Sequence, residues 1–382
     1  MADLGDIVRG EGAQYLQTHY VTPVQRKALR EIAQCRTEAM GSTQVTCDDC
    51  ESEYQLFCSC RNRSCPLCQS ETRAEWLEAR RQEILPVPYL QVVFTVPREL
   101  NVLALYCPKA FYDAVMRAAG QSVIDVGRSK LHIQLGCHSH LHTWTQQMTM
   151  HLHVHCAVPA GGISEDGRRW VSFEPRQLPV ETLRKRFRSL LCTALEAAAQ
   201  NGSFDCLPPT VRIHELLASL KTRRWKVYAQ PPFGGAEKFL QYLARYMYRI
   251  AITNDRIESY ENHQVTFRCR ASERQSHETM CTLEAQEFLR RFLMHVPPKG
   301  LVRVRSYGFL GNRNRKQNIE RARQLIGQMT TPSSRERFKP LRLCPSCSNK
   351  RGTRTAHFAP RPHIEPQLDL RLRPPPIEPV AA

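Results

Sequence analysis

The chain has 382 residues, of which 42% are hydrophobic and 24% are charged. This length and composition indicate two or three globular domains and exclude a disordered protein. Lys and Arg outnumber Asp and Glu by 54 to 36, and the formal net charge of +18 favours a polyanionic partner, with a basic surface of no function as the alternative. No apolar run approaches the roughly 20 residues of a membrane span, so we expect no membrane partner and a cytoplasmic, nucleoid-associated protein.

The 16 cysteines are unevenly placed. In a cytoplasmic protein they indicate thiols or metal ligands rather than a disulfide framework. Two C-x-x-C knuckles are separated by 14 residues, which is typical of four thiolates around a tetrahedral, structural zinc ion. The predicted ligands are Cys47, Cys50, Cys65 and Cys68. Three further cysteines belong either to a second site or to the small core of this finger: Cys35, Cys58 and Cys60.

The predicted elements then follow in chain order. Thr22 and Pro23 predict the capped start of a helix, and residues 73–83 are also helical in pattern. A strand rich in β-branched and aromatic residues is expected at 89–96 and a helix at 109–120. Strands follow at 130–136, 139–147 and 148–159, and a basic amphipathic helix at 180–200. The pattern predicts an α+β fold, a central antiparallel sheet flanked by helices, after a small zinc-binding domain.

The strand at 148–159 is rich in histidine. Seven of the 14 histidines of the chain fall between residues 132 and 155, and three of them alternate along this strand: His151, His153 and His155. Residues two apart share one face of a strand, so one strand can offer two imidazoles to one metal ion. A polar, histidine-rich sheet face without a metal is the alternative.

The segment after residue 230 is a proline- and glycine-rich loop that leads into a helix at 236–250. On this helix Tyr242 and Tyr246 are four residues apart and lie on one face, beside a parallel row formed by Arg245 and Arg249. Core packing is the ordinary role of such a tyrosine stripe. A histidine strand in a basic chain, together with the absence of a G-x-S-x-G motif, favours a catalytic role instead.

These motifs together resemble the rolling-circle transposases of bacterial insertion sequences, in the two-tyrosine branch of the HUH endonuclease superfamily with an N-terminal zinc-binding domain. The resemblance runs from about residue 26 to residue 327. Its motifs are AQCRT (33–37), SCRNRSCP (59–66), VFTVP (93–97), LHTW (141–144), HVHC (153–156), YAQPPFGG (228–235), YLARY (242–246) and RVRSYGFL (303–310). The family usually has Pro in place of Leu152 and His in place of Ser64.

The resemblance implies a chemistry for these residues. His153 and His155 would hold a catalytic Mg²⁺ or Mn²⁺ ion, with a third ligand among Gln146, Gln147 and His142. Tyr242 or Tyr246 would attack single-stranded DNA and form a 5′-phosphotyrosine, so that transposition needs no ATP. The order of the two tyrosines stays open. Candidate DNA-binding residues, on double- as well as single-stranded DNA, are Arg61, Arg63, Arg245, Arg249, Arg313 and Arg315.

The resulting domain prediction has four parts. They are a zinc-binding domain (1–80), an HUH nuclease domain (85–275) with a helical insertion at about 163–222, a basic α/β extension (276–330), and a largely disordered Pro-rich tail (331–382). The tail contains one C-x-x-C, at Cys344 and Cys347, which is either half of a metal site or not a site at all. The competing functions are a non-catalytic zinc-finger DNA-binding protein, a replication initiator or relaxase with the same chemistry, and a metal-dependent hydrolase. The sequence leaves the oligomeric state open.

Overall fold

The protein was analysed as a computed structural model that describes residues 2–69, 83–230, 250–270, 278–327 and 344–347, and the backbone of 353–358. The chain forms two compact units, and each contains segments that are distant in sequence. Unit 1 comprises residues 1–71, 252–296 and 339–382, and unit 2 comprises residues 72–251 and 297–338. These units group the chain differently from the four predicted domains, whose ranges stay a prediction. The predicted tyrosine helix, with Tyr242, Arg245, Tyr246 and Arg249, lies outside the described residues.

Unit 2 is built on a five-stranded sheet with the strand order β13-β5-β6-β3-β9. All four neighbouring pairs are antiparallel. The strands are β13 (Val304–Gly308), β5 (Gly136–Trp144), β6 (Met150–Pro159), β3 (Tyr89–Thr95) and β9 (Lys226–Gln230). A central antiparallel sheet flanked by helices confirms the predicted α+β fold class.

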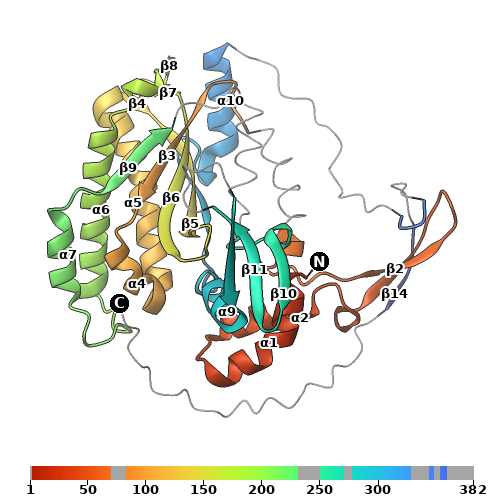
Figure 1. Cartoon of the computed structure of the whole chain (residues 1–382). Helices are drawn as coiled ribbons and strands as arrows, with labels where there is room; N and C mark the ends of the chain where they lie inside the picture. The colour runs from red at the N-terminus through yellow and green to blue at the C-terminus, as the bar shows by residue number, and fades with distance from the viewer. Residues whose placement is uncertain are drawn as a thin grey trace. The chain divides into compact units, whose positions relative to one another are not determined.

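Four helices of unit 2 belong to the layer over one face of this sheet (Figure 1). They are α4 (Asn101–Tyr106), α5 (Pro108–Leu131), α6 (Val180–Gln200) and α7 (Ile213–Lys221). Leu90, Val92 and Phe94 alternate along β3 and are fully buried in the same core as Phe111 of α5 and Phe187 of α6. Because successive strand side chains point to opposite faces, the residues between these apolar positions face the other side of the sheet.

A smaller core in unit 2 packs Ile319 and Ala322 of α10 (Arg315–Ile326) with Tyr89, Phe309 and Leu310. A three-stranded sheet, in the order β4-β7-β8, belongs to the same unit. Its strands are β4 (Ile133–Gln134), β7 (Gly161–Ser164) and β8 (Trp170–Ser172). The predicted insertion at 163–222 therefore contains β8, α6 and α7.

One disulfide joins Cys107, at the start of α5, to Cys206. This bond is an exception to the expectation of thiols or metal ligands, although one bond is not a disulfide framework. The two cysteines are 99 residues apart in sequence, and their Cα atoms are 6.3 Å apart because the fold packs both chain segments into one core. The local sequence around either cysteine gives no signal of this pairing.

Within its described residues, unit 1 combines three α-helices with two three-stranded sheets. The helices are α1 (Leu4–Thr18), α2 (Pro23–Gln34) and α9 (Ala285–Met294). One sheet has the order β10-β11-β12, with β10 (Ile257–Glu261), β11 (Gln264–Cys269) and β12 (Thr279–Glu284). The other has the order β14-β1-β2, with β14 (Thr353–Phe358), β1 (Ser42–Thr46) and β2 (Glu53–Phe57). Strand β14 lies within the range predicted as tail.

The N-terminus of α2 follows its sequence signal closely. The Thr22 hydroxyl accepts a hydrogen bond from the backbone of Gln25, and the Gln25 side chain accepts one from the Thr22 backbone. Pro23 occupies the first helical turn, where a missing N–H costs nothing. The predicted capped helix is confirmed. In the parts of the chain that the structure describes, no helix is long and apolar enough to cross a lipid bilayer.

Candidate metal centres

The first candidate centre is a cluster of imidazoles on the sheet of unit 2. Strands β5 and β6 are antiparallel neighbours, with His140 opposite His155 and His142 opposite His153. The two histidines of each strand are two residues apart, so they share one face of the strand. This face is opposite the one that packs on α5 and α6. Each of the four side chains is buried, with exposed fractions between 2% and 6%. Two strands in register therefore gather four imidazoles in one buried place.

The imidazole rings of this cluster are in contact. The ring centroids of His153 and His155 are 4.7 Å apart, as are those of His142 and His155. His140 stacks on His155 at 4.9 Å. Potential ligand atoms of His140, His142 and His155 all lie within 4.8 Å of one another. These separations allow imidazole nitrogens from both strands to converge on one cation.

A hydrogen bond at the edge of the cluster assigns the protonated nitrogen of His153. The Nδ1 of His153 lies 3.1 Å from the carbonyl oxygen of His151. A carbonyl only accepts, so Nδ1 carries the proton and the lone pair of His153 is on Nε2, as a metal ligand requires. His138, on the same face of β5, has its Nδ1 2.8 Å from the Ser306 hydroxyl of β13.

Gln91 of β3 is a further member of the site, and sequence reasoning missed it. Its side chain is buried and its amide contacts Nδ1 of His155. Oε1 of Gln91 is recorded without a hydrogen-bond partner among the described residues. Rotating the amide by 180° lets Oε1 accept a hydrogen bond from the Nδ1–H of His155 and leaves the His155 lone pair on Nε2. The alternation along β3 was the available signal, because position 91 shares its face with residues 93 and 95.

Burial favours the neutral form of His140. It lowers the pKa of His140 to about 3, and the nearby His153 and Arg303 act in the same direction. A neutral imidazole is the form that binds a metal ion. His140 was not a predicted ligand. It lies opposite His155 because of the register of β5 against β6, which the sequence does not reveal.

The predicted residues of this centre are placed as follows. His153 and His155 are brought together, and His142 joins them from the neighbouring strand. Gln146 and Gln147 lie in the turn between β5 and β6, where Gln146 is half-buried and Gln147 is exposed. Of the three candidates for the third ligand, His142 is therefore the one inside the cluster.

The second candidate centre is a cluster of thiols in unit 1 formed by Cys35, Cys60, Cys65 and Cys68. The Sγ atom of Cys68 lies 3.6 Å from those of both Cys35 and Cys60. Hydrogen bonds from the thiols of Cys35, Cys60 and Cys65 lower the pKa of Cys68, so Cys68 ionises readily. Cys35 and Cys60, considered as possible ligands from the sequence, belong to this centre, and Cys58 does not.

The third candidate centre, formed by Cys47, Cys50, Cys344 and Cys347, corrects the predicted grouping of the knuckles. The sequence placed the knuckles 47–50 and 65–68 around one zinc ion, because they have a suitable spacing. In the structure, the first knuckle meets the C-terminal pair instead. The physical reason is that Cys35 and Cys60 complete the tetrad of the second knuckle, whereas β14 pairs with β1 and the C-terminal knuckle meets the first.

Comparisons with known proteins identify the family of the chain and a zinc-binding domain at its N-terminus. A family model described as "Transposase zinc-binding domain" matches residues 7–96, and one described as "Putative transposase" matches residues 136–318. The protein named "Putative transposase y4qJ" from Sinorhizobium fredii (strain NBRC 101917 / NGR234) is 37% identical over 369 residues, which cover 90% of this chain and 92% of that protein. The chain belongs to the rolling-circle insertion-sequence transposases. The resemblance to the two-tyrosine branch with an N-terminal zinc-binding domain is confirmed.

Further relatives of this transposase are more distant. The "Transposase for insertion sequence element IS801" of Pseudomonas savastanoi pv. phaseolicola is 24% identical over 328 residues, which cover 84% of this chain and 78% of that protein. Among solved structures, the conjugative relaxase TrwC in complex with oriT DNA is similar in its metal-free form, with 13% identity and a TM-score of 0.25. The similarity covers 42% of this chain and 72% of that one, and it supports no conclusion about the transposase.

The predicted DNA-binding arginines of the transposase differ in their surroundings. Arg61, Arg63 and Arg313 are exposed. Arg315 forms a salt bridge of 3.1 Å with Glu83 and donates a hydrogen bond of 3.1 Å to the Leu310 carbonyl. These contacts give Arg315 a structural role at the start of α10, and DNA contact by any of these arginines stays a prediction.

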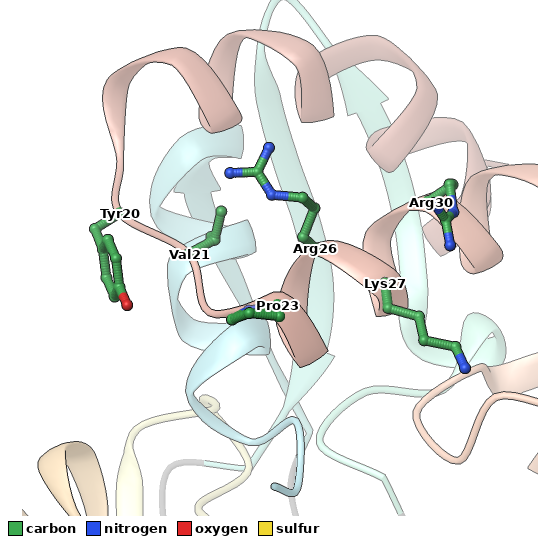
Figure 2. Close-up of a pocket in the computed structure, with 6 residues that line it drawn as sticks. All are labelled: Tyr20, Val21, Pro23, Arg26, Lys27 and Arg30. Carbon is green, nitrogen blue, oxygen red and sulfur yellow. The ribbon is translucent and has the colours of Figure 1, made fainter. Parts of the chain in front are cut away.

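A separate pocket of about 360 Å³ lies beside the first turns of α2 in the transposase. Figure 2 shows Arg26, Lys27 and Arg30 of α2 along it, with Tyr20 at one end. Tyr20 is 63% exposed, and Lys27 lies 3.5 Å from Glu31, its partner one helical turn away. Three cations and an exposed aromatic ring are the groups that contact phosphates and bases of nucleic acid. The sequence predicted the helix but not this pocket.

Proposed function

We propose that this transposase cleaves and rejoins single-stranded DNA at the ends of an insertion element, with Tyr242 and Tyr246 as nucleophiles. The observation that carries the proposal is the buried cluster of His140, His142, His153 and His155 on one sheet face, in which ligand atoms of His140, His142 and His155 lie close enough to share one cation. Burying polar groups costs free energy unless they are hydrogen-bonded or bind a ligand, so a purely structural sheet face gains nothing from four buried imidazoles. A metal-dependent phosphoryl-transfer centre uses such imidazoles as ligands.

The donor set of the cluster fits a divalent cation. Neutral imidazole nitrogens from β5 and β6 converge, and the carbonyl of His151 and the amide of Gln91 orient two of the rings. A bound divalent cation supplies Lewis-acid stabilisation of charge on the scissile phosphate. Imidazole donors favour Mn²⁺ over Mg²⁺, which prefers oxygen ligands, so Mn²⁺ is the better cation for this set.

The tyrosines perform a transfer in which every bond is accounted for. The phenolic oxygen of Tyr242 or Tyr246 loses its proton and forms a bond to phosphorus, while the bond from phosphorus to the 3′ oxygen breaks. The released 3′ oxygen takes up a proton and becomes a free hydroxyl. The phosphate remains on the tyrosine through its 5′ side, so the bond energy is retained and no nucleotide is consumed.

Two tyrosines four residues apart on the predicted helix permit two transfers in one active site. After the first transfer, the second phenol attacks a second phosphodiester and frees another 3′-hydroxyl, which attacks the first phosphotyrosine and rejoins the strands. Arg245 and Arg249 are also four residues apart in sequence. On the predicted helix they form a row beside the tyrosines and can pair with phosphate oxygens during both steps.

The test is a covalent-adduct assay on the full chain with a randomised pool of single-stranded oligonucleotides labelled at the 3′ end, with Mn²⁺ or Mg²⁺. The wild-type protein should retain the label on a denaturing gel, because the fragment 3′ of the cut stays attached. Tyr242→Phe combined with Tyr246→Phe should abolish the adduct, while Tyr248→Phe, on another helical face, should preserve it. Binding of DNA without an adduct under either metal would instead support a non-catalytic DNA-binding protein.

A further inference from the structure

The C-terminal knuckle of the chain meets the N-terminal one although they are far apart in sequence. Cys47 and Cys50 lie in the turn that follows β1, and Cys344 and Cys347 precede β14. The contacting pairs are separated by 300 residues (Cys47 and Cys347) and 294 residues (Cys50 and Cys344). The family model for the zinc-binding domain ends at residue 96, so it does not include the C-terminal knuckle.

The geometry of the four thiols is that of a closed tetrahedral site. The Sγ atoms of Cys47 and Cys347 are 3.7 Å apart, as are those of Cys50 and Cys344. Zinc–sulfur bonds of about 2.3 Å give a tetrahedron with edges of about 3.8 Å, which matches these separations. All four sulfur atoms lie within 4.8 Å of one another. None of the four cysteines forms a disulfide.

A hydroxyl lies between two of these thiols. The Ser52 Oγ lies 3.1 Å from Sγ of Cys50 and 3.3 Å from Sγ of Cys344, one from each knuckle. A hydroxyl can donate one hydrogen bond to a thiolate, and such outer contacts orient metal ligands. Ser52 is therefore placed to orient one ligand from each knuckle.

The backbone independently brings the two knuckles together. Strand β14 pairs antiparallel with β1 from Ser42 opposite Phe358 to Thr46 opposite Thr353. The pairing ends at Thr46, next to Cys47, and at Thr353, six residues after Cys347. A ladder of main-chain hydrogen bonds and a tetrad of thiols thus occupy the same end of one sheet.

We propose that Cys47, Cys50, Cys344 and Cys347 bind a second structural zinc ion, which fastens the C-terminal segment to the N-terminal zinc-binding domain. The site takes zinc because four thiolates fill a tetrahedral shell and leave no open position for chemistry. It closes a loop of 294 to 300 residues, so the metal contributes by restricting the unfolded chain as well as by bonding. The N-terminal domain is then complete only when the C-terminal segment is present.

The experiment measures zinc per chain in the purified full-length protein by elemental mass spectrometry. Wild-type protein should contain two zinc ions, and Cys344→Ser combined with Cys347→Ser should contain one. Cys35→Ser combined with Cys68→Ser should also leave one, because it removes only the other tetrad. Cys281→Ser, a half-buried free thiol outside both tetrads, should leave two. One zinc ion in the wild type that survives the change at residues 344 and 347 would overturn the proposal, as would iron in place of zinc.

A measurement on the wild-type protein keeps the test decisive if a variant does not fold. Alkylation followed by peptide mass spectrometry should find Cys344 and Cys347 protected until a chelator is added, and then modified together with Cys47 and Cys50. Amide hydrogens of β1 should exchange faster in the same step, since β14 loses its anchor. Immediate alkylation of Cys344 and Cys347 in zinc-replete protein would contradict the site.

Discussion

Glu11 of α1 offers a sharp test of how unit 1 is held together. Its side chain is only 2% exposed, yet it accepts hydrogen bonds from three groups. The Tyr260 hydroxyl and Nδ1 of His263 each lie 2.7 Å from Oε1, and Nε2 of Gln286 lies 2.9 Å from Oε2. These partners belong to β10, to the β10–β11 turn and to α9. One carboxylate therefore connects segments separated by about 250 residues of sequence.

The expected cost of changing Glu11 follows from these three bonds. Hydrogen bonds to a charged group contribute about 1.5–3 kcal/mol each, and breaking a buried charged network costs about 3–5 kcal/mol in total. Glu11→Ala should therefore lower the local free energy of unfolding by about 3–5 kcal/mol. Glu11→Gln should cost less, about 1–3 kcal/mol, because the amide oxygen keeps two bonds and a rotated Gln286 amide can accept the third.

The ionisation of Glu11 gives the same network a pH dependence. Burial opposes its ionisation, but the hydrogen bonds from Tyr260, His263 and Gln286 outweigh burial and hold its pKa below the ordinary value of 4.5. A carboxyl whose folded pKa is depressed contributes stability that is present above its unfolded pKa and is lost as the pH falls through the folded one. The protection of unit 1 should thus decline below about pH 4.5, and in Glu11→Gln this decline should be smaller.

Hydrogen exchange measured by mass spectrometry on the peptide that covers β10 and β11 reads this energy directly. Since 1.4 kcal/mol is about a factor of ten, Glu11→Ala should accelerate exchange there by about 100-fold or more. Glu261→Gln, an exposed carboxylate at the end of the same strand, is the matched control and should change little. Equal exchange rates in Glu11→Ala and wild type would refute the assigned role of the network.

Two further predictions concern the metal centre and the pocket at α2. His142→Ala should weaken Mn²⁺ binding, measured by calorimetry, by at least about tenfold. The control is His138→Ala, which lies on the same strand face but contacts Ser306 and should have little effect. Equal losses of affinity in the two variants would exclude His142 as a ligand. Replacing Arg26, Lys27 and Arg30 together by Gln should reduce the dependence of single-stranded DNA affinity on salt, with the log–log slope shallower by up to about 2, and an unchanged slope would show that the pocket does not contact phosphates.

The sequence predicted most of what is local in this fold. The alternation of His151, His153 and His155 correctly indicated a strand, and Thr22 with Pro23 correctly indicated the start of α2. Both signals depend on periodicities of two residues or one helical turn, which the chain displays directly. The α+β class followed from the same patterns, because helical and strand periods alternate along unit 2.

The thiol tetrads show where such reasoning stops. Spacing predicted that the knuckles at 47–50 and 65–68 are metal ligands but could not decide their partners, because any two knuckles of suitable spacing satisfy the same rule. The decision comes from the pairing of β14 with β1, a contact between residues more than 300 positions apart. A non-local strand pair leaves no periodic trace in the sequence between its members.

The imidazole cluster has the same limit at a finer scale. Sequence spacing shows that His153 and His155 share a face, but the position of His142 and His140 beside them is set by the register of β5 against β6. A shift of one residue would turn the β5 histidines into the apolar core and leave the β6 pair alone. The buried Gln91 adds a requirement of orientation, since only one end of its amide leaves the His155 lone pair facing the other rings. Metal binding by the proposed centre therefore depends on the register of β5 against β6 and on the orientation of the Gln91 amide.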